Sequence, residues 1–177
     1  MVTGTGAGTH THAGTHTHTH HAEAARAWSA AASVVDPEVP VLSIDDLGVL
    51  RQVTVTDNGV EVVITPTYSG CPAMDAIRED VVRALTAAGF GEVRVRLELS
   101  PAWTTDWISA AGRSALKEYG IAPPPAATGP VSVRLSVKCP HCGSLDTREV
   151  AHFGSTSCKA LFVCRGCGEP FDHFKAL

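Results

Sequence analysis

The chain has 177 residues, 44% of them hydrophobic, which suits one domain of ordinary size with a small appendage. No stretch approaches the ~20 consecutive apolar residues of a membrane span, and no basic segment followed by an apolar one marks a secretory signal, so we predict a cytoplasmic protein. The net charge of −4, from 14 basic and 18 acidic residues, argues against a nucleic-acid-binding protein.

The first 21 residues form a histidine-rich tail. They contain six of the nine histidines among Thr, Gly and Ala, with no large apolar residue beyond Val2. Such a segment cannot offset the entropy of folding, so we predict disorder over residues 1–21. Alternating imidazoles could capture divalent metal loosely. Because nothing fixes the geometry of a selective site, a tail with incidental metal affinity is the favoured interpretation.

Residues 22–120 are predicted to form a compact α/β domain that begins with a helix and a β-hairpin. The alanine-rich opening stretch favours a helix, which Pro37 would end near Asp36. Residues 49–69 read as two strands on either side of an Asp-Asn-Gly turn at residues 57–59. This turn tolerates positive φ and therefore predicts a tight antiparallel hairpin.

The rest of this domain is predicted to alternate helix, strand and helix. Residues 72–88 have an apolar stripe at helical spacing, with a proline in the first turn and a glycine after the last. Residues 92–99 alternate Val or Leu with Arg or Glu, as a half-buried strand does. A third helix is expected from Thr104 or Thr105 to Gly120. Strand, helix and strand in succession imply a right-handed crossover with parallel strands, so we expect a small mixed sheet.

Two C-x-x-C-G motifs follow a linker rich in proline, residues 121–130. In a cytoplasmic protein six cysteines stay reduced and predict metal or thiol chemistry rather than three disulfides. Each motif directs two thiolates at one metal, and two motifs complete a tetrahedral shell. We predict that residues 131–177 form a small β-rich ribbon around structural zinc, with an iron–sulfur cluster as the less favoured alternative. The predicted ligands are Cys139, Cys142, Cys164 and Cys167.

The ribbon contains one further cysteine, Cys158, which is either a core residue or an alternative ligand. Its six basic and four acidic residues are too few for a phosphate-binding stripe, so nucleic acid is not a predicted partner and protein docking is the favoured use. Zinc should supply much of the folding free energy of so small a unit. Loss of the metal is therefore expected to unfold residues 131–177 and to leave the α/β domain folded.

Cys71 lies where the second predicted strand gives way to the helix at residues 72–88. The unpaired amides and dipole of a helix N-terminus favour a thiolate, so we expect a lowered pKa and a role as nucleophile or metal ligand rather than in packing. Residues 22–120 contain no histidine to serve as a base. A Cys–His hydrolase is therefore disfavoured, and we predict no catalytic residue. Nearby aspartates would matter only if the fold brings them close; the candidates are Asp36, Asp45, Asp46 and Asp75.

Several stretches in combination resemble the PaaD family, accessory proteins of phenylacetate degradation. They are DPEVPVLSIDDLGVL, TPTYSGCPAMD, SPAWTTDWIS, YGIAPP and FGSTSCKALFVCRGCGEPFDHFKAL, and the resemblance covers about residues 30–177. The first domain is also similar to the SufT-like iron–sulfur assembly factors, in which Asp-Pro and a Cys-Pro at a helix start recur. These pairs fall on Asp36-Pro37 and Cys71-Pro72.

The resemblance implies an accessory factor, not an enzyme, that helps to mature the iron–sulfur reductase or the diiron oxygenase of phenylacetyl-CoA epoxidase. Cys71 would ligate or relay a transient iron–sulfur cluster and Asp36 would shape the site. The implied partners are those subunits and the iron–sulfur assembly machinery, without nucleic acid or membrane; a homodimer is compatible with the sequence. The alternative is a structural or docking subunit in which Cys71 is merely buried. A thiol enzyme acting on an acyl-CoA is the weakest of the three hypotheses, because no base or phosphate-binding loop is visible.

Overall fold

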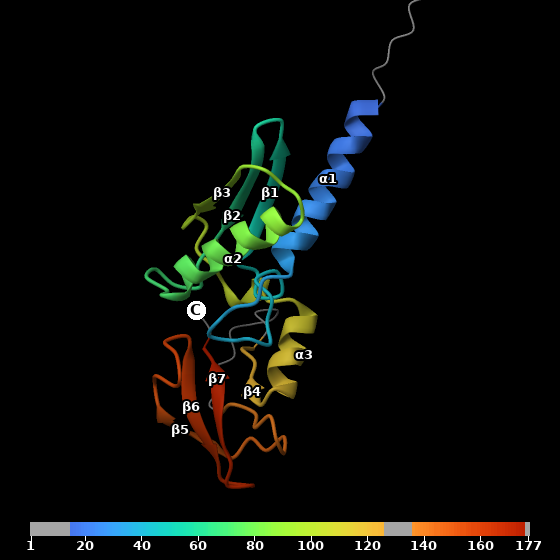
Figure 1. Cartoon of the computed structure of the whole chain (residues 1–177). Coiled ribbons are helices and arrows are strands. Elements are labelled where there is room, and N and C mark those ends of the chain that lie inside the picture. The colour runs from blue at the N-terminus through green and yellow to red at the C-terminus, as the bar shows by residue number, and fades with distance from the viewer. Residues whose placement is uncertain (1–14, 126–135, 176–177) are drawn as a thin grey trace, which may run out of the picture.

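The computed structural model describes residues 15–125 and 136–175 (Figure 1). In these ranges three α-helices accompany two small sheets, as the sequence predicts, and no helix has both the length and the apolar composition that crossing a membrane requires. The elements are, in order, α1 (Thr15–Ala32), β1 (Leu50–Thr56), β2 (Gly59–Ile64), α2 (Ala73–Ala87), β3 (Val93–Leu97), the 3₁₀ turn η1 (Thr105–Trp107), α3 (Ala110–Glu118), β4 (Ile121–Ala122), β5 (Thr147–Ala151), β6 (Lys159–Cys164) and β7 (Pro170–Phe174).

The first sheet is mixed, in the order β1-β2-β3. β1 and β2 form the predicted antiparallel hairpin, closed at the Thr56–Gly59 pair, and β2 runs parallel to β3 through the α2 crossover. α1 packs against β1 and α2, and α2 packs against β3, so both helices cover one face of the sheet. The core beneath them contains Ile77, Val81 and Leu85 of α2, each fully buried.

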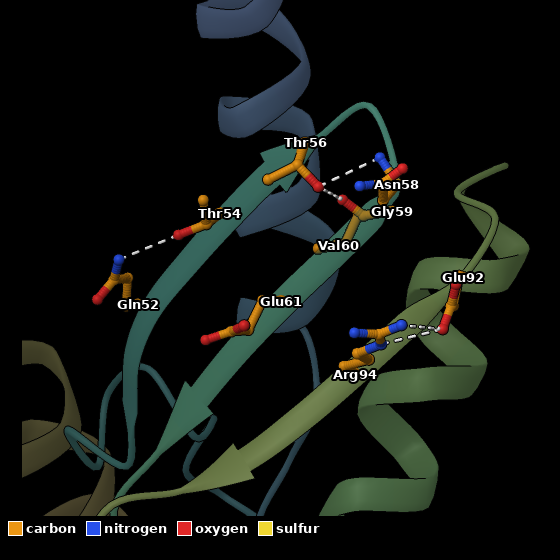
Figure 2. A pocket seen from close by; sticks show the side chains of 9 residues that line it. All are labelled: Gln52, Thr54, Thr56, Asn58, Gly59, Val60, Glu61, Glu92 and Arg94. Atoms are coloured by element: carbon orange, nitrogen blue, oxygen red, sulfur yellow. Dashed lines mark hydrogen bonds and ion pairs between the residues drawn. The ribbon is translucent and has the colours of Figure 1, made fainter.

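The other face of this sheet is open and polar (Figure 2). The side chains of Thr54, Glu61 and Arg94 follow one another across the three strands there. Arg94 Nη2 pairs with Glu92 Oε1 at 2.8 Å. The shallow hollow on this face is lined by two carboxylates, one guanidinium and neutral polar groups, with no thiol or imidazole among them. None of these residues belongs to the group of metal ligands found in the described part of the chain.

α1 departs from the sequence prediction at both ends. It begins at Thr15, so the prediction of disorder is wrong for residues 15–21, while residues 1–14 lie outside the described ranges. Extending a helix that is already nucleated costs little per residue, so the alanine-rich segment propagates toward the N-terminus. At its other end α1 stops at Ala32 rather than near Asp36, because the chain turns so that Val35 pairs with Ser43.

The third predicted helix is broken in two. Thr104 caps η1 by accepting a hydrogen bond from the Asp106 N–H, and Ser109 Oγ caps α3 by accepting one from the Gly112 N–H at 2.8 Å. Between them Ile108 is extended. Two N-capping side chains five residues apart compete for the helix start, and the second one begins α3. The end near Gly120 is as predicted.

The second sheet, in the order β4-β7-β6-β5, joins the ribbon to the rest of the chain. Its edge strand β4 lies inside the segment predicted as a linker and pairs in parallel with β7. Phe174 of β7 lies in the same core cluster as Trp103 and Leu116, with the Phe174 and Trp103 rings 6.1 Å apart. The ribbon has a small cluster of its own that includes Phe162 and Phe171, but Phe174 belongs to the core of the first unit. The two units therefore pack together in the described part of the chain, and no free linker separates them over residues 121–125.

Candidate metal centre and thiol site

The four predicted ligands of the ribbon converge on one point. The Sγ atoms of Cys139, Cys142, Cys164 and Cys167 all lie within 4.8 Å of one another. Two of the separations are 3.9 Å, from Cys139 to Cys167, and 3.6 Å, from Cys142 to Cys164. A tetrahedral zinc with Zn–S bonds of about 2.3 Å places its sulfurs about 3.8 Å apart. The thiols therefore already have the spacing that a Cys₄ metal site requires.

The local backbone explains this convergence. In each C-x-x-C-G motif the glycine N–H donates to the carbonyl of the first cysteine, from Gly143 to Cys139 at 3.0 Å and from Gly168 to Cys164 at 2.9 Å. Both glycines have positive φ, +77° and +82°, which a residue with Cβ rarely adopts. The resulting tight turns point both thiols of each motif the same way.

The thiols of the metal centre affect one another strongly. The backbone N–H of Cys167 lowers the pKa of Cys164 to about 7. The N–H of Glu169 lowers the pKa of Cys167, but desolvation and the neighbouring thiols raise it to about 12. The Cys164 thiolate therefore forms readily, and its negative charge opposes the ionisation of the next thiol. A bound dication would stabilise all four thiolates together, which is the chemistry this donor set favours.

Cys71 lies just before α2, as predicted, but its electrostatic environment is different. Pro72 is the N-cap, and Cys71 is buried with 9% of its surface exposed. Burial raises the pKa of its thiol, although the Ala73 N–H lowers it; the nearby charges of Glu38 and Asp36 raise it further. The expectation of a lowered pKa is therefore wrong. Desolvation and two carboxylates outweigh the helix N-terminus, and the thiol is held protonated.

Asp36 is close enough to Cys71 to influence its pKa, but its first role is to shape the backbone. Its Oδ1 accepts the N–H groups of Glu38 at 2.8 Å and Val39 at 2.9 Å. Burial nevertheless raises the pKa of Asp36. The buried carboxylate therefore holds the turn that presents Glu38.

The other candidate aspartates have different roles. Asp46 accepts hydrogen bonds from the hydroxyls of Ser43 at 2.9 Å and Ser109 at 2.6 Å, which fixes the start of α3. The side chain of Asp75 is 93% exposed and lies 4.0 Å from Arg78. The backbone carbonyl of Asp45 accepts the Gly48 N–H at 2.9 Å, in the turn that leads into β1.

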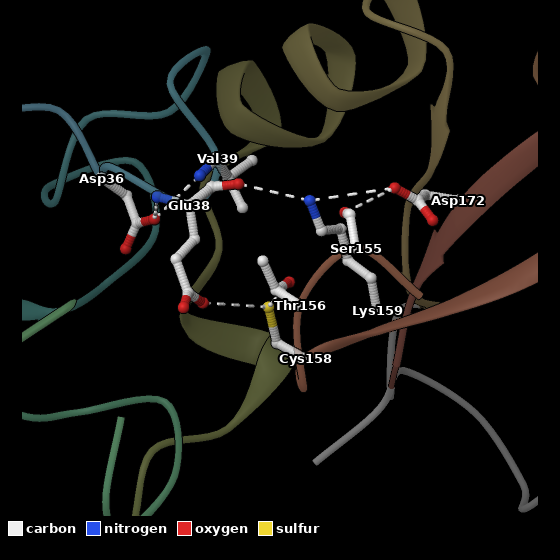
Figure 3. A network of polar contacts seen from close by, with 8 residues as sticks. All are labelled: Asp36, Glu38, Val39, Ser155, Thr156, Cys158, Lys159 and Asp172. Atoms are coloured by element: carbon white, nitrogen blue, oxygen red, sulfur yellow. Dashed lines mark hydrogen bonds and ion pairs between the residues drawn. The ribbon is translucent and has the colours of Figure 1, made fainter. Parts of the chain in front are cut away.

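The ribbon brings further residues to the thiol site that the sequence analysis missed or left open (Figure 3). The Cys158 thiol lies 3.0 Å from Thr156 Oγ1 and donates to Glu38 Oε2 at 4.0 Å. Lys159 Nζ donates to the Glu38 carbonyl at 3.2 Å. Two signals could have found these residues: Glu38 follows directly on the Asp-Pro pair, and Cys158 is the cysteine that a four-ligand site leaves over.

Comparison with known proteins assigns both parts of the chain. Residues 123–175 match the PaaD zinc beta ribbon domain, and residues 25–97 match a family described as iron–sulfur cluster assembly protein. A protein of Escherichia coli (strain K12), provisionally named as one of the subunits of 1,2-phenylacetyl-CoA epoxidase, is 46% identical over 150 residues, 85% of this chain and 91% of that protein.

The chain belongs to the PaaD family. Its first part also has relatives without the ribbon match. An Fe–S protein maturation auxiliary factor of Porphyromonas gingivalis is 39% identical over 79 residues, 44% of this chain and 74% of that protein. The crystal structure of a DUF59 domain from Bacillus anthracis is 26% identical with a TM-score of 0.53, and the match covers 56% of this PaaD-family chain and 96% of that one. The PaaD family thus combines a DUF59-like fold with a ribbon.

Proposed function

We propose that this protein is an accessory factor of phenylacetate degradation that helps to load an iron–sulfur or diiron cofactor into the multicomponent phenylacetyl-CoA epoxidase. The names of its PaaD-family and Fe–S maturation relatives support this role. The observation that carries it is the buried Cys71 thiol, beside Asp36 and Glu38, in the part of the chain that matches the iron–sulfur assembly family. Reductase or oxygenase subunits are the proposed recipients, and the assembly machinery is the proposed donor.

The environment of Cys71 suits transient rather than permanent binding. Iron must displace the thiol proton, and the raised pKa makes that displacement cost more free energy than at an exposed cysteine. A cluster held on such a thiol is bound weakly enough to be passed on. Desolvation at the same time protects the cargo from water, and the Asp36 turn keeps Glu38 in place beside it.

The ribbon cysteines are proposed to hold zinc in a structural role. Cys139, Cys142, Cys164 and Cys167 would complete its shell, and the ion would hold β5, β6 and β7 in register. Because β7 packs on the first unit through Phe174, zinc would also fix how the ribbon meets that unit. We assign no turnover chemistry to the chain, since residues 22–120 contain no histidine to act as a base.

The test is Cys71→Ser in cells that co-produce the reductase and oxygenase subunits. Serine is nearly isosteric, so the variant should fold with an unchanged circular-dichroism spectrum, but its hydroxyl cannot replace a thiolate toward iron. We expect iron and acid-labile sulfide in the client subunits to fall at least fivefold, and chemical reconstitution of those subunits to restore part of the loss.

A structural or docking subunit is the second candidate, and the burial of Cys71 is the observation that favours it. Under that hypothesis Cys71 only fills space. Full cofactor content with Cys71→Ser, together with binding to the purified complex in fixed stoichiometry, would support this candidate and reject the maturation role.

A further inference from the structure

Cys158 is an unusual cysteine for a packing residue. It lies on the loop that leads into β6, with 4% of its surface exposed, in the core cluster that also contains Cys71. Buried structural cysteines normally contact apolar groups. The thiol of Cys158 instead lies 3.0 Å from the Thr156 hydroxyl and points toward a Glu38 carboxylate oxygen at 4.0 Å (Figure 3).

The two thiols belong to one core cluster and have neighbours in common. The Tyr68 hydroxyl interacts with the side chains of both Cys71 and Ser157, the residue before Cys158. Glu38 influences the pKa of both thiols as well. Cys71 comes from the iron–sulfur assembly part of the chain and Cys158 from the ribbon, so the cluster exists only where the two parts meet.

We propose that Cys71, Cys158 and Glu38 form one binding site for a thiophilic metal, iron in the proposed function, to which the ribbon contributes the second thiol. Two thiolates and a carboxylate are a donor set that iron and similar metals accept. This inference rests on the proposed function and adds to it a second thiol ligand, Cys158, which the ribbon supplies.

The charges around Glu38 fit this assignment. Burial and the charge of Asp36 raise the pKa of Glu38, and the charge of Lys159 lowers it in part. Lys159 Nζ donates to the Glu38 carbonyl at 3.2 Å and lies 3.8 Å from Asp172. Among the described residues no ion pair neutralises that carboxylate within 4.0 Å. A cation between the thiols would therefore complete the partial compensation that Lys159 gives to the neighbouring carboxylates of Glu38 and Asp36.

The donor atoms of this site lie farther apart than those of the ribbon metal centre. Among the described residues, the four ribbon cysteines form the one group of three or more ligands with all donor atoms within 4.8 Å. Binding must therefore draw the donor atoms of Cys71, Cys158 and Glu38 closer together. There is open space just before Cys71, because Gly70 has φ of +96° and no neighbouring atom lies within 4 Å of a Cβ built on it.

The geometry can be tested with phenylarsine oxide, which bonds two neighbouring thiols at once and releases one water. The reagent is added to the reduced, zinc-loaded full chain, and native mass spectrometry counts adducts and zinc together. We expect one phenylarsenic and one retained zinc per wild-type chain. Cys71→Ser and Cys158→Ser should each reduce the adduct at least tenfold and keep the zinc, whereas Ser155→Ala, on the same loop, should keep both.

An adduct that persists in Cys158→Ser, or that forms only as zinc is lost, would overturn the proposal. A second experiment uses Fe²⁺ alone under anaerobic conditions. Cys158→Ser should weaken Fe²⁺ binding at least tenfold, and serine at position 71 or 158 should remove the thiolate-to-iron absorption.

The iron content of the client subunits separates the failure of this inference from the failure of the proposed function. If the client subunits contain normal iron with Cys158→Ser but not with Cys71→Ser, the role of the second thiol is rejected and the proposed function is kept. If they contain normal iron with both variants, the proposed function is rejected.

Discussion

At Cys71 two electrostatic influences oppose each other. The start of α2 offers an N–H group to the thiol, which favours the thiolate, while burial and the charges of Glu38 and Asp36 favour the thiol. The second influence prevails, so the residue is protected from oxidation and alkylation near neutral pH. This distinguishes it from the activated cysteines of thiol enzymes, which have lowered pKa values.

This balance predicts how the reactivity of Cys71 depends on pH. In a Cys158→Ser background, the rate of alkylation by iodoacetamide should rise about tenfold per pH unit from pH 7 to 8.5 without levelling, because only the thiolate reacts and its pKa lies above the ordinary value of 9.0. Adding Glu38→Gln should increase the rate at pH 8, since it removes a charge that raises this pKa. A rate that levels below pH 8 would contradict the assignment.

Gly48 is a second residue whose identity matters. Its φ is +73°, and a Cβ at this position would lie 2.5 Å from the Cβ of Trp107 and 2.7 Å from its carbonyl oxygen. Gly48→Ala should therefore lower the free energy of unfolding by about 3 kcal/mol, from backbone strain plus steric overlap. Gly89→Ala is the matched control: φ is +86° but no atom lies within 4 Å, so about 1 kcal/mol is expected. Urea unfolding measures the free energy of unfolding of both variants, and equal decreases in the two would refute the steric argument.

At the scale of elements, the ribbon sheet includes a strand from outside the ribbon, and in the proposed function it also depends on zinc. The β4 segment completes one edge, so the sheet is built from residues on both sides of positions 126–135. Phe174 extends from β7 into the larger core. Because Phe174 packs in the core of the first unit, loss of the ribbon should lower the stability of that unit without unfolding it.

Cys142→Ser tests this coupling. The variant should lose zinc and the native amide dispersion of residues 136–175, because binding of the metal supplies on the order of 10 kcal/mol to such a site. The first sheet should persist but lose about 3 kcal/mol of stability with the withdrawal of Phe174. Zinc analysis, amide NMR and urea unfolding report these effects. Cys158→Ser, which removes a thiol outside the zinc set, should keep the zinc; a metal-free Cys142→Ser with native dispersion throughout would refute the prediction.

The elements that sequence patterns predict well are those whose signals are local. The alternation in β3, the Asp-Asn-Gly turn between β1 and β2, and the paired C-x-x-C-G motifs each lie within a few residues and need no tertiary context. The two-residue strand β4 has no period to detect, and the break at Ile108 depends on competition between two caps. At the thiol site, Glu38 and Cys158 meet only because the ribbon docks, and the pKa of Cys71 depends on burial, which a local pattern does not encode.

At the scale of the whole molecule, the two parts of the described chain pack against each other. The ribbon keeps a small core cluster of its own, while its Cys158 and Phe174 belong to the core of the first unit. Trp103 and Phe174 meet across the junction, and the Trp103 indole N–H donates to the Leu47 carbonyl at 2.9 Å. Lys159 and Cys158 add polar contacts to Glu38 at the same junction. Motion between the two parts would break the Trp103–Phe174 contact and the contacts to Glu38 together, while the Trp103–Leu47 hydrogen bond holds Trp103 in the first unit.

Unfolding should therefore be cooperative across the junction. Tryptophan fluorescence and far-UV circular dichroism are expected to report a single urea transition, and Phe174→Ala should lower the free energy of unfolding by about 3–5 kcal/mol as a buried aromatic side chain is removed. Phe153→Ala is the matched control, because Phe153 is 65% exposed and its loss should cost less than about 1 kcal/mol. Two separated transitions in the wild-type chain would show that the parts unfold independently.

Strand β6 would couple the two metal sites proposed for this molecule. It starts directly after Cys158 and ends at Cys164, so one strand of about 20 Å runs from the proposed iron site to the proposed zinc site. If both proposals hold, zinc at one end of the strand would help to position the thiol at the other end. A cell short of zinc would then lose iron delivery by this protein before iron itself became scarce, and the supply of one metal would limit the use of another.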